Sequence, residues 1–406
     1  MNRNLLLGII LAAAVLLVGG MVVQQSTGGS GQSQSEKSTE SNIDPESWIN
    51  AAGESAAVDG KEEAEESKAA EASEAVEESE AEKESEAAEE SDVSDPYSEE
   101  IFAMGTVMTI TAYGPGRKKA VTEAKKEVQR LDALLSTGKE NSEISQLNAA
   151  GSGEVSEDVA ALIARAQEFY RKTEGLFDCT IYPVMELWGF PTQDYHVPSE
   201  QELQEALSLV DGSKVKLDGK AVTLGEDQKI DLGGIAKGYT SDRLMQIFED
   251  YGVQSAIVSL GGNVQVLNRK TDGTFWRVGI QDPTDTQGAI LGVAEVADQA
   301  VITSGGYERY FEENGKTYIH IVDPETGVPV ENELDSVTII SSDGTLADAL
   351  STSLFIMGIE KASDYWRESE DSFEAIFVKK DGSVSVTEGI AEYFQTDREL
   401  EVIRTD

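Results

Sequence analysis

The chain has 406 residues, of which 76 are acidic and 32 are lysine or arginine, so its formal net charge is −44. A charge of this sign and size excludes general binding to nucleic acid phosphates or to anionic lipid surfaces, and any phosphate-bearing ligand needs a locally built site. Cys179 is the only cysteine, which excludes an intramolecular disulfide and a thiolate metal cluster within one chain.

An uncharged apolar run occupies residues 5–23, and Arg3 lies on its N-terminal side. A run of this length can span a bilayer as a helix, with its positive flank on the cytoplasmic side. The alternative is a cleaved signal peptide, but neither a small-x-small cleavage pattern nor a cysteine for lipid attachment follows the run. We therefore expect residues 1–30 to form a single-pass anchor in the cell membrane, with the rest of the chain extracytoplasmic.

Residues 31–100 are rich in alanine, glutamate and serine. Between Glu36 and Glu100 there are 24 acidic residues and 4 lysines, a net charge of −20. The composition favours helices, but the segment has no apolar stripe to bury, so we expect a disordered acidic linker. Residues 101–406 remain, enough chain for one large folded domain or two closely packed ones.

The folded part is expected to begin with a strand and two helices. Alternating β-branched residues predict a strand over 104–113. A helix should follow through about Ser136, and a second helix near 157–172. The apolar residues that share one face of the first helix are Val121, Ala124, Val128, Leu131 and Leu135.

The rest of the chain mixes strands with helices. Ser199 followed by Glu202 is typical of a capping box that opens a short helix, and Asp218-Gly219 predicts a tight hairpin turn within 215–224. Further strands are expected at 229–233, 255–267, 278–282, 291–296, 300–305, 318–323 and 336–341, with helices over 239–252 and 346–358. This mixed order predicts an α+β fold.

The segment 346–358 is apolar on nearly every face, so we expect a helix enclosed by the core. Asp348 and Thr352 are four residues apart and project from one face of it. A carboxylate and a hydroxyl at this spacing are hard oxygen ligands that suit Mg²⁺. In the alternative, structural interpretation, Asp348 caps a helix amino terminus and Thr352 bonds back to its own turn. The residue types alone leave the two interpretations equal.

Glycine-rich segments follow three predicted strands, at 231–238, 260–263 and 303–307. Glycine permits close approach of the backbone to a ligand. The first segment runs into a helix, where amide groups and the charge of Lys237 suit a phosphate. Simple turn chemistry is the commoner explanation of any one such segment, but three of them together favour a ligand site.

The chain has two histidines. His196 lies in a polar stretch before a proline, and an exposed loop is the better interpretation. His320 lies in a predicted strand that runs into Asp323-Pro324. Either a structural histidine or a base that works at neutral pH fits this position.

Seven segments in order along the chain carry a family resemblance. They are MGTVM (104–108), LLSTGKENSEISQLN (134–148), FDCTIYPVMELWGF (177–190), DLGGIAKGY (231–239), TSGGY (303–307), HIVDPETG (320–327) and ADALSTSL (347–354). Together they resemble the ApbE family of FAD:protein FMN transferases over nearly all of residues 101–406. The resemblance implies an ApbE-like, T-fold-like arrangement of mixed sheets with packed helices.

The resemblance also implies a site and a reaction. A Ser or Thr hydroxyl of an acceptor protein attacks the FMN-side phosphorus of FAD, and AMP leaves. His320 is the candidate base, and Asp348 acts through the metal. The Mg²⁺ ligands implied are Asp348, Ser351, Thr352 and the backbone of Gly234, and the residues implied to line the FAD site are Met104, Leu176, Phe177, Asp178, Asp231, Lys237 and Val322.

Two positions depart from the family pattern. Gly138 stands where an aromatic residue is common, and Ser351 stands where some members carry another acid. The lipid-bearing cysteine of bacterial members is also missing, and the apolar run of residues 5–23 takes its place as an anchor.

The acceptors implied are extracytoplasmic redox proteins that carry a Ser/Thr flavinylation motif. Two other functions stay open. In a FAD pyrophosphatase, water replaces the acceptor hydroxyl and free FMN and AMP accumulate. A non-enzymatic, extracytoplasmic FAD-binding protein would hold flavin without releasing AMP.

Overall fold

The computed structural model describes residues 49–50, 95–285 and 288–405, all within one compact unit, Glu46–Asp406. The predicted anchor and most of the predicted linker lie outside the described residues. Within the linker, β1 (Ile49–Asn50) pairs in parallel with β9 (Trp276–Gln281), and β2 already begins at Tyr97. No helix in the described ranges is long and apolar enough to cross a membrane.

The chain order of helices and strands is mixed, as predicted. The helices are α2 (Arg117–Leu135), α3 (Glu143–Ala150), α4 (Glu157–Lys172), α5 (Tyr182–Trp188), α6 (Glu200–Leu207), α7 (Gly233–Asp250) and α8 (Gly344–Glu368), with 3₁₀ turns η2 (Cys179–Ile181) and η3 (Gly212–Lys214). The remaining strands are β2 (Tyr97–Ala103), β3 (Thr106–Tyr113), β4 (Ser152–Glu154), β5 (Lys216–Asp218), β6 (Ala221–Thr223), β7 (Ser255–Leu260), β8 (Asn263–Leu267), β10 (Ile290–Val296), β11 (Ala300–Gly305), β12 (Tyr310–Glu313), β13 (Lys316–Ile319), β14 (Leu334–Ser341), β15 (Glu374–Lys379), β16 (Val384–Thr387), β17 (Phe394–Thr396) and β18 (Leu400–Ile403).

The largest sheet has nine strands in the order β18-β16-β15-β14-β11-β8-β7-β3-β2. Neighbours in it are antiparallel, except β16 and β18, which are parallel. A second sheet has the order β1-β9-β10-β17, and β12-β13 and β4-β6-β5 form two small sheets. The α+β fold of mixed sheets and helices expected from the sequence is confirmed.

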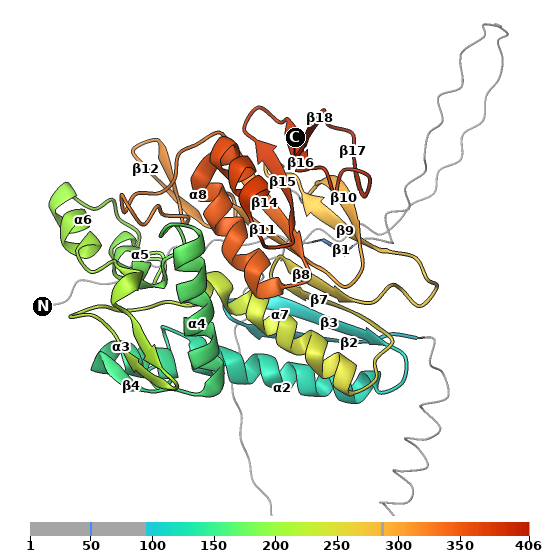
Figure 1. The fold of residues 1–406 in the computed structure, drawn as a ribbon, viewed down its shortest axis with the longest axis horizontal. Helices are drawn as coiled ribbons and strands as arrows, with labels where there is room; N and C mark the ends of the chain where they lie inside the picture. Colours follow the sequence, from blue (N-terminus) through green and yellow to red (C-terminus); the bar gives the residue numbers. More distant parts are fainter. Residues whose placement is uncertain (1–48, 51–94, 286–287, 406) are drawn as a thin grey trace, which may run out of the picture. The chain divides into compact units, whose positions relative to one another are not determined.

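Helices cover one face of the nine-stranded sheet. α2 packs on β2 and β3, α7 on β7 and β8, and α8 on β11 and β14 (Figure 1). The four-stranded sheet packs against the other face through a shared apolar cluster. In β11, Ala300 and Ile302 belong to the helix-side cluster and Val301 to the sheet-side cluster. Burial on both faces explains the continuous apolar runs of the central strands.

Several local predictions are confirmed. α2 buries the predicted apolar face, and Ser199 with Glu202 forms the capping box of α6. β5 and β6 pair as the predicted hairpin. Residues 346–358 lie within α8, most of them buried, and a kink at Gly358, with φ 73°, separates them from the end of the helix. Helix α3 was not predicted.

The strand predicted over 229–233 is wrong. Ile230 donates its N–H to Asn148 Oδ1 (2.8 Å), and its carbonyl accepts from Asn148 Nδ2 (2.8 Å), so a side-chain amide takes the place of a neighbouring strand. α7 then begins at Gly233 rather than at Tyr239.

Three other predicted strands are shorter or divided. Residues 255–267 form the hairpin β7–β8, because Gly261 and Gly262 turn the chain with φ of 60° and 97°. Met104 (φ 49°) and Gly105 (φ 75°) form the β2–β3 turn and do not belong to a strand. The strand predicted over 318–323 ends at Ile319.

Candidate active site

Helices α7 and α8 meet at two glycines, and this contact positions Asp348. A Cβ on Gly238 would lie 2.2 Å from the Gly344 carbonyl oxygen and 2.8 Å from Asp348 Cβ. Only a residue without a side chain allows this approach. The glycines of 231–238 therefore lie in the first turns of α7, where one of them serves helix packing, and do not form a loop before the helix.

The amino terminus of α8 is held by carboxylates other than Asp348. Asp343 Oδ1 accepts from the Leu346 N–H (2.8 Å). Asp242, on α7, accepts from the N–H groups of Gly344 (2.8 Å) and Thr345 (2.9 Å). Asp348 is thus not the cap of its own helix, which removes that structural interpretation.

Asp348 is buried between the two helices, with 6% of its surface exposed. Its Oδ2 accepts from the Gly238 N–H at 2.8 Å. In a regular helix the N–H of Gly238 donates to the carbonyl of Gly234, four residues earlier. Because Asp348 also accepts from this N–H, the Gly234 carbonyl has to share its donor. Burial raises the pKa of Asp348, while the charge of Lys237, the Gly238 N–H and the side chain of Asn263 favour its ionised form.

Hydroxyl groups from α8 and β11 meet about one helical turn after Asp348. Ser304 Oγ, on β11, lies 2.7 Å from Ser351 Oγ and 3.1 Å from Thr352 Oγ1. Ser351 Oγ also donates to the Asp348 carbonyl at 2.9 Å. Ser304 therefore joins the hydroxyls of Ser351 and Thr352, which lie about one helical turn after Asp348 on α8.

This donor set fits a hard divalent cation, because it offers carboxylate, hydroxyl and carbonyl oxygens. Asn263 Nδ2 is buried next to this carboxylate and, in the part of the chain that the structure describes, has no hydrogen-bond partner of good geometry. A buried amide in this state fits a site that a ligand or water completes. No cluster of three or more His, Cys, Asp or Glu residues suited to a metal occurs among the described residues.

His320 follows β13 and is half-buried. The main-chain N–H of His320 donates to the main-chain carbonyl of Arg309 (3.0 Å), and the ring atom Nδ1 lies 3.2 Å from the same oxygen. Because a carbonyl oxygen only accepts, this contact places a proton on Nδ1 and leaves the lone pair on Nε2. Burial, with the charges of Arg309 and Lys237, lowers the pKa of His320 to about 4, so the ring is neutral at pH 7.

His320 and Asp348 have a charged neighbour in common, Lys237. The positive charge of Lys237 acts on both of them and also on Glu308. Burial raises the pKa of Asp231, which is half-buried, while the charge of Arg309 favours its ionised form. Glu308 is exposed and lies within electrostatic range of both Lys237 and Arg309. Lys237 and Arg309 therefore link these groups electrostatically.

The family model described as "ApbE family" matches residues 104–377. The chain belongs to the ApbE family. A FAD:protein FMN transferase from Klebsiella pneumoniae is 33% identical over 294 residues, 71% of this chain and 90% of that protein. One from Treponema pallidum is 34% identical over 320 residues, 73% of this chain and 88% of that protein.

Solved structures of the ApbE family share the fold. The ApbE protein from Thermotoga maritima has a TM-score of 0.69 and 32% identity, with 74% of this chain and 99% of that chain covered. The apo form of the flavinyl transferase ApbE from Pseudomonas stutzeri has a TM-score of 0.66 and 28% identity, with 74% and 96% covered.

Some of the residues that the ApbE resemblance assigns to the FAD site lie on, beside or against α7. Met104 is in the β2–β3 turn, where its N–H donates to Asp132 Oδ1 (3.0 Å) and its sulfur lies 3.9 Å from Thr240 Oγ1, on α7. A Cβ on Gly234 would lie 3.2 Å from the ring of Phe177. Asp231 lies two residues before α7 and Lys237 in its second turn, within electrostatic range of Arg309 and His320 respectively.

Asp178 and Val322 are held by contacts within the protein. Asp178 Oδ1 accepts from the Thr180 N–H (2.8 Å) and Oγ1 (2.6 Å), and its Oδ2 accepts from the Gly212 N–H (2.9 Å). This carboxylate fixes a loop. The side chain of Val322 is buried in an apolar cluster with Trp188.

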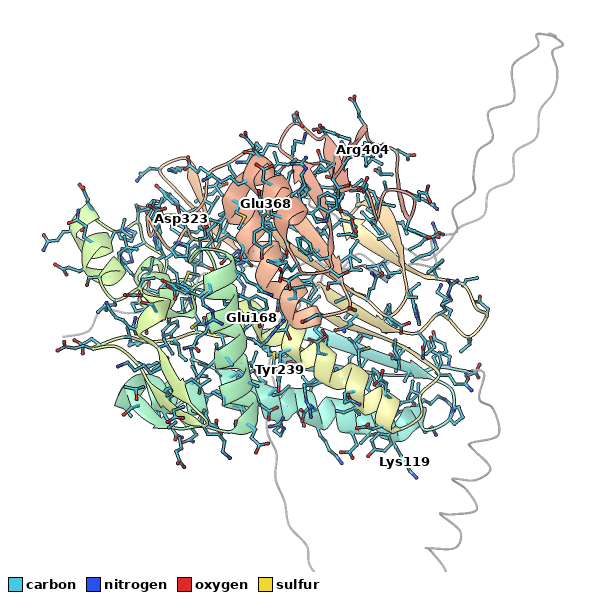
Figure 2. The ribbon with its side chains drawn as sticks, in the orientation of Figure 1. Lys119, Glu168, Tyr239, Asp323, Glu368 and Arg404 are labelled. Carbon is cyan, nitrogen blue, oxygen red and sulfur yellow. The ribbon has the colours of Figure 1, made fainter. Side chains whose placement is uncertain are left out.

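Leu176 is half-buried, and His196 is exposed, as predicted. After His320 the chain turns at Asp323, labelled in Figure 2, whose Oδ1 accepts from the Glu325 N–H at 2.8 Å.

Sequence reasoning missed Ser304, Asn263 and Arg309 as site residues. Ser304 and Asn263 lie inside glycine-rich segments that the sequence did single out, so their positions could have been found there. Arg309 carries no such signal. Two surface hollows, of about 480 and 380 Å³, are lined by other residues and do not coincide with this centre.

Proposed function

We propose that this chain is an Mg²⁺-dependent FAD:protein FMN transferase. It attaches FMN through a phosphoester bond to a Thr or Ser hydroxyl of extracytoplasmic acceptor proteins and releases AMP. Family membership supports the reaction class, and the chain is a transferase of this type. The observation that carries the finer proposal is a buried carboxylate at the α7–α8 contact, followed one helical turn later by hydroxyls that meet Ser304, with a neutral histidine in electrostatic range of Lys237 on α7.

Each site residue has a separate role in the transfer. The free lone pair of His320 Nε2 accepts the proton of the acceptor hydroxyl as its oxygen bonds to phosphorus. The bond from that phosphorus to the AMP oxygen breaks. Mg²⁺ bound by Asp348, Ser351, Thr352 and the Gly234 carbonyl would neutralise pyrophosphate charge. Lys237 adds a fixed positive charge beside it.

We also propose that the catalytic domain is tethered to the membrane. The apolar run at residues 5–23 supports an anchor, and the acidic composition of the linker supports reach from the membrane. Such a tether favours acceptors on the same membrane face, because it confines the domain to a shell around its anchor.

The test incubates the purified full chain with FAD, Mg²⁺ and an extracytoplasmic flavoprotein that carries a Ser/Thr motif. Mass spectrometry follows the acceptor, and chromatography follows AMP. An FMN adduct that forms together with AMP supports the proposal. AMP with free FMN and no adduct indicates a pyrophosphatase, and bound flavin without AMP indicates a FAD-binding protein.

A further inference from the structure

Arg309 lies between the TSGGY segment and β12, and its side chain is exposed. Within the described ranges its guanidinium forms no hydrogen bond and no ion pair within 4.0 Å, whereas Arg130 pairs with Glu127 (2.8 Å) and Asp158 (2.8 Å). In a chain with a net charge of −44, many carboxylates are available to an arginine. Its five donors are therefore available to a ligand.

The groups around Arg309 are those of the candidate site. Its carbonyl accepts from both the N–H and the ring of His320. Its charge favours the ionised forms of Asp231 and Glu308 and the neutral form of His320. A Cβ on Gly105, beside Met104, would lie 3.7 Å from Arg309 Nη2.

The position of the base fixes where charge develops in the reaction. The acceptor hydroxyl must lie within hydrogen-bond reach of His320 Nε2 when it attacks. The phosphorus that it attacks is therefore close to His320, whose ring lies within electrostatic range of the Arg309 guanidinium. Phosphoryl transfer spreads negative charge over the non-bridging oxygens, and a guanidinium fork matches two such oxygens.

We propose that Arg309 is a catalytic residue that binds the transferring FMN-side phosphoryl group of FAD and stabilises its charge during transfer. This inference rests on the proposed function. The acceptor oxygen forms the new bond to phosphorus, the bond to AMP breaks, and the proton goes to His320. The hydrogen bonds of Arg309 strengthen as negative charge develops on the phosphoryl oxygens, and Arg309 neither gains nor loses a covalent bond.

A purely structural role of Arg309 can be separated from this one. The contacts that position His320 come from the Arg309 main-chain carbonyl, which every substitution keeps. Changes at the side chain therefore test the guanidinium alone.

The experiment uses the full chain with FAD, Mg²⁺ and an acceptor, and compares Arg309→Ala, Arg309→Lys and wild type. Arg309→Ala should lower kcat about 10²–10³-fold, the size expected for a lost donor to transition-state charge. FAD affinity, followed by flavin fluorescence, should change less than about threefold. Arg309→Lys should recover part of the rate, and added guanidinium ion should partly restore Arg309→Ala.

The matched control is Arg171→Ala. Arg171, at the end of α4, is also exposed and has no ion pair among the described residues. Its substitution should leave kcat unchanged.

Contrary results separate the two proposals. A wild-type chain that transfers no FMN refutes the proposed function itself. A transferring wild type refutes the role of Arg309 alone if Arg309→Ala keeps its kcat, if only FAD affinity falls, or if guanidinium ion restores nothing.

Discussion

Replacing Asp348 by asparagine removes one negative charge and almost no volume. An asparagine oxygen can still accept from the Gly238 N–H, so the α7–α8 contact should survive. Since burial raises the pKa of Asp348, the charged carboxylate is costly in the protein without metal. We therefore expect metal-free Asp348→Asn to be at least as stable as metal-free wild type at pH 7.

Added Mg²⁺ should change the Tm of wild type and of Asp348→Asn by different amounts. A ligand present at 100 times its Kd stabilises the folded state by about 2.7 kcal/mol. At about 2 °C per kcal/mol for a domain of this size, Mg²⁺ should raise the Tm of wild type by about 5 °C. Asp348→Asn should show almost no rise, and its FMN transfer should fall at least about 10³-fold, because the site loses its only charged ligand.

The assay is a thermal scan of both full-length proteins with and without Mg²⁺, followed by transfer rates on the same samples. Ca²⁺ and Mn²⁺ serve as comparison ions. An equal Mg²⁺-dependent rise in Tm for both proteins, or wild-type transfer by Asp348→Asn, would refute the metal assignment.

Three further predictions concern neighbouring residues. Gly238→Ala should lower the free energy of unfolding by about 1–3 kcal/mol or more, because its Cβ would overlap the Gly344 carbonyl; urea titration measures this, and Gly153→Ala, whose Cβ meets nothing within 4 Å, is the control. The folded-state pKa of His320, about 4, lies below its unfolded value of 6.5, so its contribution to stability is complete above pH 6.5 and is lost as the pH falls toward 4. His320→Asn should therefore lose less stability than wild type between pH 7 and pH 5 in urea titrations, and an identical pH dependence would contradict the burial of a neutral ring. Ser304→Ala should raise the Mg²⁺ concentration needed for half-maximal transfer about 10–100-fold, since Ser304 contacts both Ser351 and Thr352; Ser98→Ala, on β2, should leave it unchanged.

The elements that the sequence predicts well are those whose local signals agree with their packing. The 3.6-residue apolar period of α2 predicted both the helix and its buried face. The apolar helix at 346–358 was predicted because nearly all of its faces are enclosed by β11, β14 and α7.

The wrong predictions are caused by contacts between segments that are far apart in the sequence. Residues 229–232 have strand composition, but Asn148 takes the main-chain hydrogen bonds of Ile230, and no local pattern shows an amide about 80 residues away. The glycines of 231–238 favoured a loop in the prediction, but α7 already begins at Gly233, and Gly238 is a helix residue whose missing side chain allows contact with Gly344.

For the site, the spacing of Asp348 and Thr352 predicted a shared helix face. It could not show whether Asp348 capped the helix, because the carboxylates that hold the amino terminus of α8 are Asp343 and Asp242, one of them on another helix. Arg309 was missed for a similar reason: its link to His320 runs through a main-chain carbonyl, which has no sequence signature.

The central claim is that a divalent cation binds between α7 and α8. Anomalous diffraction from crystals grown with Mn²⁺ and FAD measures this directly. We expect an Mn²⁺ peak in contact with Asp348 and Thr352 and beside the flavin pyrophosphate. A peak elsewhere, or a bound pyrophosphate with no metal at Asp348, would contradict it.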